Sequence, residues 1–237
     1  MENTNINPAI ALKSKPLAHG TKVMQGPQAI PMHQKKYDSI IFDLAGVLIS
    51  WQPALTADQL FPDTQAATII QTLVKDPHWL EFDRGNITIS DLASHAAERH
   101  NFDLILTTQI VATIANHLPP FSTMVKALLA AKAQGYKIYI LSNMPGPFYK
   151  ELIHNYDFFN HCDGIVASYQ IKFIKPELEI YQYLLEKFNI DPSTALFIDD
   201  VEENIVAANT LGIDGIVCKK DIEVIHLLEQ NNILKPE

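Results

Sequence analysis

Residues 40–48 read Ile40-Ile41-Phe42-Asp43-Leu44-Ala45-Gly46-Val47-Leu48, an apolar run that reaches a single aspartate and then turns at a glycine. An unbroken apolar run is typical of a strand buried on both faces, as in a parallel sheet. Ligands of such sheets bind beyond the carboxyl ends of the strands, where Asp43 would lie. Because burying a carboxylate that has no functional role is costly, we interpret Asp43 as a functional residue.

The composition limits the class of protein. The 237 residues are 47% hydrophobic, enough for one sizeable core and a smaller second module. A net charge of −9 argues against a nucleic-acid partner. The sequence has no apolar run of about 18 residues and no signal-peptide core at its start, so we expect a cytoplasmic protein without a membrane partner. Cys162 and Cys218 border apolar segments and are expected to be free thiols.

Residues 1–36 differ in texture from the rest of the chain. They combine four prolines with five lysines and one glutamate, and they show neither helical nor strand periodicity. This pattern predicts a flexible N-terminal arm. The arm is basic and the remainder acidic, so it either docks on its own body or on a partner, or it has no role.

The middle of the chain is helical in pattern. Segments 53–60, 64–75, 77–83, 90–100 and 104–117 follow one another, with Ser90 as an expected N-cap. We therefore predict a helical cap domain over residues 51–118, inserted directly after the first strand. The core domain is then made of residues 37–50 and 119–237.

Strands and helices alternate in that core. Strands are predicted at 38–43, 137–141, 164–167, 195–198 and 215–218. One helix is expected to be capped by Ser122, and others to begin near residue 147, at Pro176 and after Asp200, the last one burying Val201 and Ile205. This alternation predicts an α/β fold with a doubly wound parallel sheet.

Polar side chains follow three of these strands. They are Asp43, the pair Ser142-Asn143 and the pair Asp199-Asp200, and Lys175 lies just before Pro176. The carboxyl ends of parallel strands share one edge, so these groups can converge. Carboxylates suit Mg²⁺, a hydroxyl and an amide can hold phosphate oxygens, and a lysine can neutralise developing charge. An aspartate can act as the nucleophile.

The same residues carry a family resemblance. The motifs Phe42-Asp43-Leu44-Ala45-Gly46-Val47, Leu141-Ser142-Asn143, Lys175-Pro176-Glu177 and Phe197-Ile198-Asp199-Asp200 resemble, in order, the four motifs of the haloacid dehalogenase (HAD) superfamily. The resemblance covers about residues 38–220. Within the superfamily the chain resembles the helical-cap phosphatases, in the subgroup of sugar-phosphate phosphatases and the phosphatase domain of epoxide hydrolases.

The resemblance implies a role for each site residue. Asp43 would attack phosphorus and form an aspartyl-phosphate, Ser142 and Asn143 would position the phosphoryl oxygens, and Lys175 would stabilise charge. Mg²⁺ would be held by Asp43, the backbone carbonyl of Ala45 and Asp200, with Asp199 as a further or outer ligand. The implied function is Mg²⁺-dependent hydrolysis of a small phosphomonoester, such as a sugar phosphate.

Ala45 departs from the pattern of most phosphatases in the superfamily, which carry a second aspartate there as general acid–base. Haloacid dehalogenases also lack it, but they work without metal, whereas Asp199-Asp200 resembles a metal pair. Phosphonoacetaldehyde hydrolases have alanine there with a cap lysine, and Lys75, beside Asp76, is poorly suited to that role. A degenerate member that binds a phospho-ligand or a protein without turnover is a further alternative. In an active phosphatase, either nothing replaces the acid or His78, Glu81 or Asp83 donates from the cap.

Residues 78–85 of the predicted cap mix aromatic and charged side chains. They resemble the loop that contacts substrates in this subgroup, so Trp79 and Arg84 are candidate substrate-binding residues. In the alternative, Trp79 and Phe82 are core and Arg84 is a surface charge. The remaining histidines show no metal-ligand spacing and are expected to be ordinary surface or helix residues: His95, His100, His117, His154, His161 and His226. The oligomeric state is left open.

Overall fold

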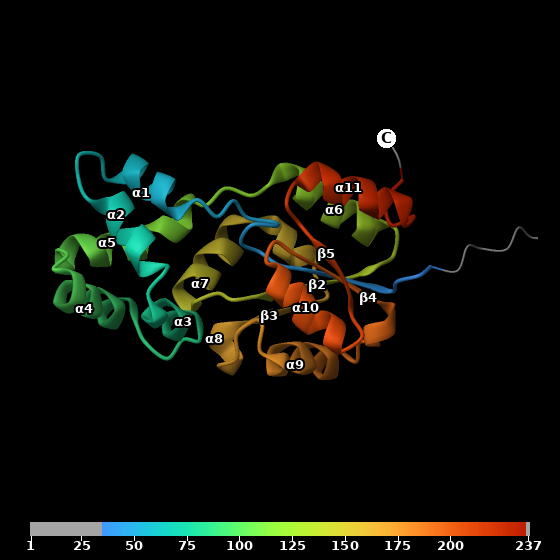
Figure 1. Ribbon diagram of the computed structural model, residues 1–237. Helices are drawn as coiled ribbons and strands as arrows, with labels where there is room; N and C mark the ends of the chain where they lie inside the picture. Colours follow the sequence, from blue (N-terminus) through green and yellow to red (C-terminus); the bar gives the residue numbers. More distant parts are fainter. Residues whose placement is uncertain (1–34, 236–237) are drawn as a thin grey trace, which may run out of the picture. The chain divides into compact units, whose positions relative to one another are not determined.

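The protein is described by a computed structural model that covers residues 35–235. Within this range five strands form one parallel sheet in the order β3-β2-β1-β4-β5 (Figure 1). The strands are β1 (Ser39–Phe42), β2 (Lys137–Ser142), β3 (Gly164–Ala167), β4 (Ala195–Asp199) and β5 (Asp214–Val217). The predicted doubly wound α/β fold is confirmed.

Helices cover both faces of the sheet. They are α6 (Ser122–Ala133), α7 (Gly146–Asn155), α8 (Ser168–Ile171), α9 (Leu178–Phe188), α10 (Glu202–Thr210) and α11 (Asp221–Gln230). Figure 1 shows α6 and α11 on one side of the sheet and α9 and α10 on the other. Side chains alternate along a strand, so Ile40 and Phe42 enter one hydrophobic core and Ile41 enters the second. Burial on both faces explains why β1 is apolar throughout.

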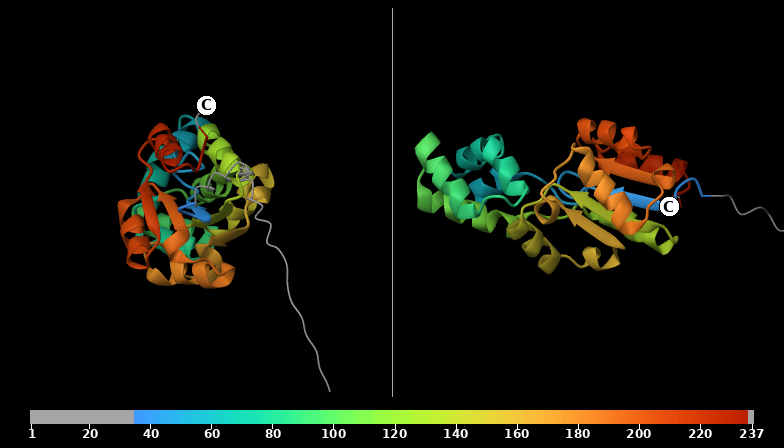
Figure 2. Two further views of the ribbon diagram at one scale, coloured as in Figure 1. Left: turned by 90° about the vertical axis from the view of Figure 1, so that its right-hand side faces the viewer. Right: turned by 90° about the horizontal axis from the view of Figure 1, so that it is seen from below.

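A helical insertion separates β1 from α6, as predicted. It contains α1 (Pro53–Leu60), α2 (Ala66–Leu73), α3 (Pro77–Asp83), α4 (Ile89–His100) and α5 (Leu104–Ile114), followed by a short 3₁₀ turn, Ala115–His117. Figure 2 shows these helices gathered beyond one end of the sheet. The boundaries proposed for a cap domain over 51–118, and for a core over 37–50 and 119–237, stay predictions. Among the described residues, every helix is too short or too polar to span a bilayer.

Several helix starts differ from the sequence-based prediction. Thr88, not Ser90, caps α4: its side chain accepts from the amide of Asp91, whose carboxylate accepts from the amide of Thr88. Ser122 is the first residue of α6 and does not cap it. Pro176 does not open a helix, because α9 starts at Leu178 with Glu177 as its N-cap. Val201, expected to be buried, precedes α10 and is 41% exposed.

Two helices had no sequence-based prediction. The single-turn helix α8 follows β3 directly, and α11 follows β5 and packs on α6. The predicted flexible arm lies outside the described residues, apart from Lys35 and Lys36. Lys36 Nζ lies 3.0 Å from a carboxylate oxygen of Asp214 at the start of β5. Cys162 and Cys218 are free thiols, as expected.

Candidate active site

The register of the sheet brings the predicted site residues together. Phe42 at the end of β1 is paired with Ile140 of β2 on one side and with Ile198 of β4 on the other. The residues that follow these positions therefore meet at one edge. Asp43, Asp199 and Asp200 each offer a carboxylate oxygen, and these atoms all lie within 4.8 Å of one another.

Lys175 joins two of these carboxylates inside the protein. Its Nζ lies 2.8 Å from Oδ1 of Asp43 and 2.6 Å from Oδ2 of Asp199, and all three side chains are buried. Burial alone would lower the pKa of Lys175, but Asp43 and Asp199 raise it above its ordinary value. Burial raises the pKa of Asp43, and the lysine opposes that rise. The ammonium group is thus held charged beside the predicted nucleophile.

The side chain of Asn143 fixes the backbone of Lys175. Its amide nitrogen donates to the Lys175 carbonyl at 3.0 Å, and its amide oxygen accepts from the Lys175 N–H at 2.7 Å. The buried hydroxyl of Ser142 lies 3.5 Å from the Asn143 carbonyl. The predicted contacts of Ser142 and Asn143 with phosphate oxygens stay predictions. What the side chain of Asn143 does in this structure is to position the lysine.

The paired aspartates have different surroundings. Asp199 is fully buried, and besides Lys175 it accepts hydrogen bonds from the Asn204 side chain at 3.0 and 3.1 Å and from the Val201 amide at 2.8 Å. Asp200 is half-buried. Its pKa is raised mainly by burial and, to a smaller extent, by repulsion from Asp199. A carboxylate with partners on both oxygens is poorly placed to ligate, so Asp200 is the better candidate ligand.

Gly46 lets the chain pass close to Asp200. Its φ of +84° is readily adopted by glycine, and a Cβ at this position would lie 2.3 Å from Oδ2 of Asp200. Residues 45–46 therefore run directly against this carboxylate and next to Asp43. An all-oxygen donor set of Asp43, the Ala45 carbonyl and Asp200 fits Mg²⁺, which prefers oxygen ligands and retains some of its waters.

A small chamber lies beside the loop after β1, with Ala45, two residues beyond Asp43, in its wall. Its volume is about 120 Å³, and its lining consists of Ala45, Trp51, Trp79, Asp83, Asn143, Met144, Pro145 and Phe148. Trp79 of α3 packs within this wall, its ring centroid 6.2 Å from that of Trp51 and 6.1 Å from that of Phe148. Trp79 is thus both part of the hydrophobic core and a wall of the chamber, which combines the two alternatives posed for it. Its predicted contact with substrate stays a prediction.

Asp83, at the end of α3, lines the same chamber as Ala45. Burial, with a smaller contribution from Asp43, raises the pKa of Asp83 to about 8, although Lys175 acts in the opposite direction. Among residues 35–235, no hydrogen-bond donor to the Asp83 carboxyl contributes to this pKa. The side chain is therefore a largely protonated acid at neutral pH, close enough to Asp43 and Lys175 for their charges to act on it.

Ser168 links Asp83 to the sheet. Its hydroxyl donates to the Asp83 carbonyl at 2.5 Å and accepts from the Met144 amide at 2.9 Å. Met144 directly follows Asn143, so one buried hydroxyl connects the end of α3 to the loop after β2. Ser168 was not predicted from the sequence, because a single serine after a short strand is not distinctive.

Arg84 makes a different contact from the one predicted. Its guanidinium forms a two-pronged ion pair with Glu177, and it donates to the Lys172 carbonyl at 2.8 Å. Glu177 belongs to the loop that carries Lys175. Arg84 is therefore neither a free surface charge nor a side chain directed into the chamber, and its predicted role on substrate needs this pair to open. We call the Arg84–Glu177 pair the clasp.

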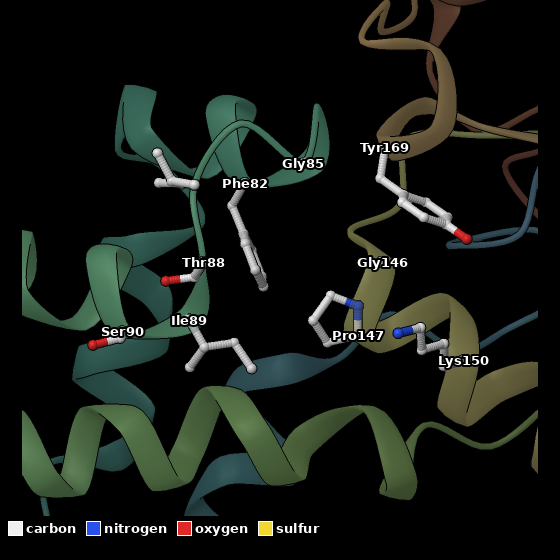
Figure 3. A pocket seen from close by; sticks show the side chains of 10 residues that line it. Phe82, Gly85, Thr88, Ile89, Ser90, Gly146, Pro147, Lys150 and Tyr169 are labelled. Carbon is white, nitrogen blue, oxygen red and sulfur yellow. The ribbon is translucent and has the colours of Figure 1, made fainter.

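Phe82 lines a second, larger hollow of about 470 Å³ (Figure 3). Its walls are mostly apolar and include Ile87, Ile89, Pro147 and Tyr169, with Lys150 at one side. The ring of Phe82 also contacts two chamber residues, with centroids 5.6 Å from Trp79 and 5.9 Å from Phe148. Phe82 thus stands between the chamber and the hollow.

The comparison with protein families identifies the fold and its chemistry. The family model for haloacid dehalogenase-like hydrolases matches residues 37–212, which include the strand-end carboxylates and Lys175. The chain belongs to this family of hydrolases. The resemblance stated from the four motifs is confirmed.

Named relatives of this HAD-like hydrolase include several phosphatases. The sesquiterpene phosphatase astK of Aspergillus oryzae is 28% identical over 76% of this chain and 89% of its own length. The phosphoglycolate phosphatase of Colwellia psychrerythraea is 22% identical over 78% of this chain and 85% of its own length. The drimenol cyclase drtB of Aspergillus calidoustus is 26% identical, but the match spans only 35% of that protein.

Solved structures share the fold. A HAD family enzyme from Bacteroides thetaiotaomicron superimposes with a TM-score of 0.64 at 23% identity, covering 81% of this chain and 99% of that one. That enzyme has also been solved in complex with magnesium and inorganic phosphate, with a TM-score of 0.61. A dehalogenase with an intermediate complex gives a TM-score of 0.67 at 14% identity.

Proposed function

We propose that this HAD-like hydrolase is an Mg²⁺-dependent phosphatase of small phosphomonoesters that uses Asp43 as its nucleophile. The observation that carries the proposal is the buried contact of Lys175 with Asp43, beside the freer carboxylate of Asp200. A carboxylate that is to attack a phosphoryl group needs a nearby positive charge. The phosphatases among the named relatives support the same reaction.

The geometry around Asp43 suggests how the first step runs. Oδ1 of Asp43 accepts from the Leu44 amide at 2.7 Å and contacts Lys175, which orients the carboxylate and leaves Oδ2 to attack phosphorus. The bond from phosphorus to the leaving alcohol oxygen breaks, and the phosphoryl group is carried by Asp43 until water displaces it. Asp43, the Ala45 carbonyl and Asp200 would hold Mg²⁺, which when bound neutralises phosphoryl charge.

We assign the proton transfer to Asp83. Alanine at position 45 has no proton to give, whereas Asp83 lines the same chamber and has a raised pKa. The protonated carboxyl of Asp83 donates to the leaving alcohol oxygen as that bond breaks. The resulting carboxylate then accepts a proton from the water that attacks the phosphoryl group, which restores the acid for the next turnover.

The walls of the chamber favour an apolar alcohol as the leaving group. Trp51, Trp79, Met144, Pro145 and Phe148 offer no match for the many hydroxyl groups of a sugar, and Asp83 and Asn143 are the polar side chains of the lining. Hydroxyl groups that lose water without gaining partners are penalised. The sesquiterpene phosphatase among the relatives supports this substrate class. We therefore propose phosphate esters of apolar alcohols ahead of sugar phosphates.

A phosphate-release screen tests the reaction. Short alkyl, prenyl, aryl and sugar phosphates are assayed with Mg²⁺ and with EDTA, for wild type and Asp43→Asn. We expect release that EDTA abolishes and that falls at least about a thousandfold in the variant, with mass spectrometry excluding deamidation back to aspartate. Binding of inorganic phosphate without turnover would indicate a degenerate binder. Metal-independent halide release from 2-haloacids would indicate a dehalogenase.

A second experiment tests the substrate class separately. Phe82→Ala removes the ring between the chamber and the hollow, so kcat/KM for prenyl phosphates longer than the chamber should rise relative to that for short alkyl phosphates. Leu80→Ala is the control, because this α3 residue is 47% exposed and lines neither space. A preference for sugar phosphates in wild type would reject the apolar class and leave the phosphatase reaction intact.

A further inference from the structure

Three imidazoles surround one aspartate at the start of α3. Nδ1 of His78 lies 3.0 Å from Oδ1 of Asp76, and Nε2 of His95 and Nε2 of His100 lie 3.4 and 3.3 Å from Oδ2. His78 belongs to α3, whereas His95 and His100 belong to α4. The sequence predicts His95 and His100 to be ordinary surface or helix residues, and the structure adds that both contact Asp76 from α4. Their partners lie on another helix, and spacing along the sequence does not reveal them.

The separations suit a metal ion. Ligands 2.0–2.1 Å from a tetrahedral Zn²⁺ lie about 3.3–3.4 Å from one another. His78 and His95 lie at 3.0 and 3.4 Å from different oxygens of Asp76, and one donor atom from each of Asp76, His78 and His95 lies within 4.8 Å of the other two. Imidazole and carboxylate together are a usual ligand set for Zn²⁺ and its neighbours among the transition metals.

The nitrogen of His95 is the strongest pointer to a missing partner. Nε2 of His95 is buried and has no hydrogen-bond partner among the described residues, although it faces Asp76. Buried polar atoms in folded proteins nearly always have a partner. A coordinated ion would use this lone pair directly.

Asp76 is held ready as a ligand. Its Oδ1 accepts a hydrogen bond from the His78 amide at 2.9 Å, which fixes the carboxylate at the start of α3. His100 contacts the same carboxylate oxygen as His95 and can orient it, in the way that ligating carboxylates are commonly hydrogen-bonded by neighbours.

We propose that Asp76, His78 and His95 form a second metal site, for Zn²⁺ or a similar divalent transition metal, with His100 orienting the carboxylate and water completing the coordination. The rings of His78 and His95 are stacked, with centroids 3.4 Å apart. Since a metal lies near the plane of each imidazole that it binds, one ring must turn. His78, whose side chain is 41% exposed, has room to do so. The ion would fix the start of α3 to α4, and the other end of α3 carries Asp83.

The test is Zn²⁺ binding to the tag-free full-length chain. Isothermal titration calorimetry is carried out in excess Mg²⁺, and again in Asp200→Asn, so that binding at the strand-end carboxylates is separated. We expect one Zn²⁺ per chain in both proteins. His95→Ala and His78→Ala should each weaken Zn²⁺ binding. The loss should be no smaller than about 10–100-fold, which is the usual cost of removing a residue that only hydrogen-bonds to a metal ligand. His226→Ala is the matched control, because His226 is an exposed histidine paired with a single carboxylate, Glu229.

The thermal unfolding of wild type provides a readout independent of the variants. Zn²⁺ that binds only the folded chain must raise the melting temperature, and a chelator must reverse the rise. The proposal is overturned if wild type binds no Zn²⁺ beyond what Asp200→Asn removes. It is also overturned if folded His78→Ala, verified by circular dichroism, binds Zn²⁺ as wild type does.

Discussion

Alanine at position 45 leaves the loop after β1 without an acid, and Asp83 offers one from the helical insertion. The two residues line one chamber, and burial gives Asp83 a pKa of about 8. An acid must be protonated to donate, so kcat/KM should fall with rising pH above about 8, where each further pH unit lowers the protonated fraction of Asp83 about tenfold. On the acid side kcat/KM should fall below about pH 7, because burial raises the pKa of the nucleophile Asp43 to about 7 and Asp43 must be ionised to attack.

Asp83→Asn tests this assignment. We expect kcat/KM for alkyl phosphates to fall about 10²–10⁴-fold, the worth of a positioned acid. 4-Nitrophenyl phosphate should lose much less, because its leaving group needs little protonation, and the decline above pH 8 should disappear. The measurement is a pH profile for both substrates. Equal losses on both, or a gain in alkyl phosphate cleavage by Ala45→Asp in wild type, would contradict the role of Asp83.

The two aspartates after β4 should respond differently to substitution. Asp200→Asn should raise the Mg²⁺ concentration for half-maximal activity at least about tenfold, because Asp200 has the freer carboxylate. Asp199→Asn should instead lower kcat with a smaller shift in Mg²⁺ dependence, since Asp199 holds Lys175 at 2.6 Å. Magnesium titrations of both variants decide the matter. Equal shifts would show that both residues ligate.

At this scale, residues at strand ends could be predicted, whereas for the insertion the sequence named Asp83 only as one of three candidate donors and did not place it. Asp43, Asp199 and Asp200 end or follow strands, and parallel register alone brings strand ends together, whereas Lys175 lies in the loop between α8 and α9 and was predicted from its motif. The placement of Asp83 beside the chamber depends on how α3 packs, and the partner of Arg84 lies in the loop before α9. Neither contact leaves a periodic or local signal in the sequence.

Helix α4 shows how a cap is chosen. Ser90 and Thr88 are both acceptable cap residues, but only Thr88 has an acidic residue three positions later whose carboxylate can return a hydrogen bond. The reciprocal bonds fix the start of the helix at Ile89. The helical periodicity of the sequence predicted the helices of the insertion with small errors at their ends. These errors arise because several residues near a helix start can accept hydrogen bonds from the same backbone amides.

Thr88→Ala and Ser90→Ala form a matched pair. Thr88→Ala should lower the free energy of unfolding by about 1 kcal/mol, the usual worth of a cap. Ser90→Ala should change it by no more than about 0.5 kcal/mol, as expected for a surface substitution. Chemical denaturation of both variants measures the difference. If Ser90→Ala proves the more costly change, the capping box at Thr88 is not what stabilises α4.

In the described chain as a whole, the topology of the sheet could be predicted from the sequence. The packing of the helical insertion against the sheet could not. Apolar strands separated by amphipathic helices leave few topologies, and right-handed crossovers reduce them further. The helical insertion contacts the segment after β2 through the rings of Trp79 and Phe82, which pack against Phe148. The polar bonds of Ser168 and Arg84 add contacts with the segments after β2 and β3. Such contacts depend on three-dimensional placement, which no short motif encodes.

The clasp of Arg84 and Glu177 ties the end of α3 to the loop that carries Lys175. It involves the residue directly after Asp83, so any movement of α3 away from that loop would have to separate these opposite charges. Where product release needs that movement and is the slow event, dissolved salt, which weakens that attraction, should quicken steady-state turnover and leave the first-turnover burst unchanged. Glu177→Gln should remove this salt dependence. Steady-state turnover would then depend on the ionic strength of the solution through this single ion pair.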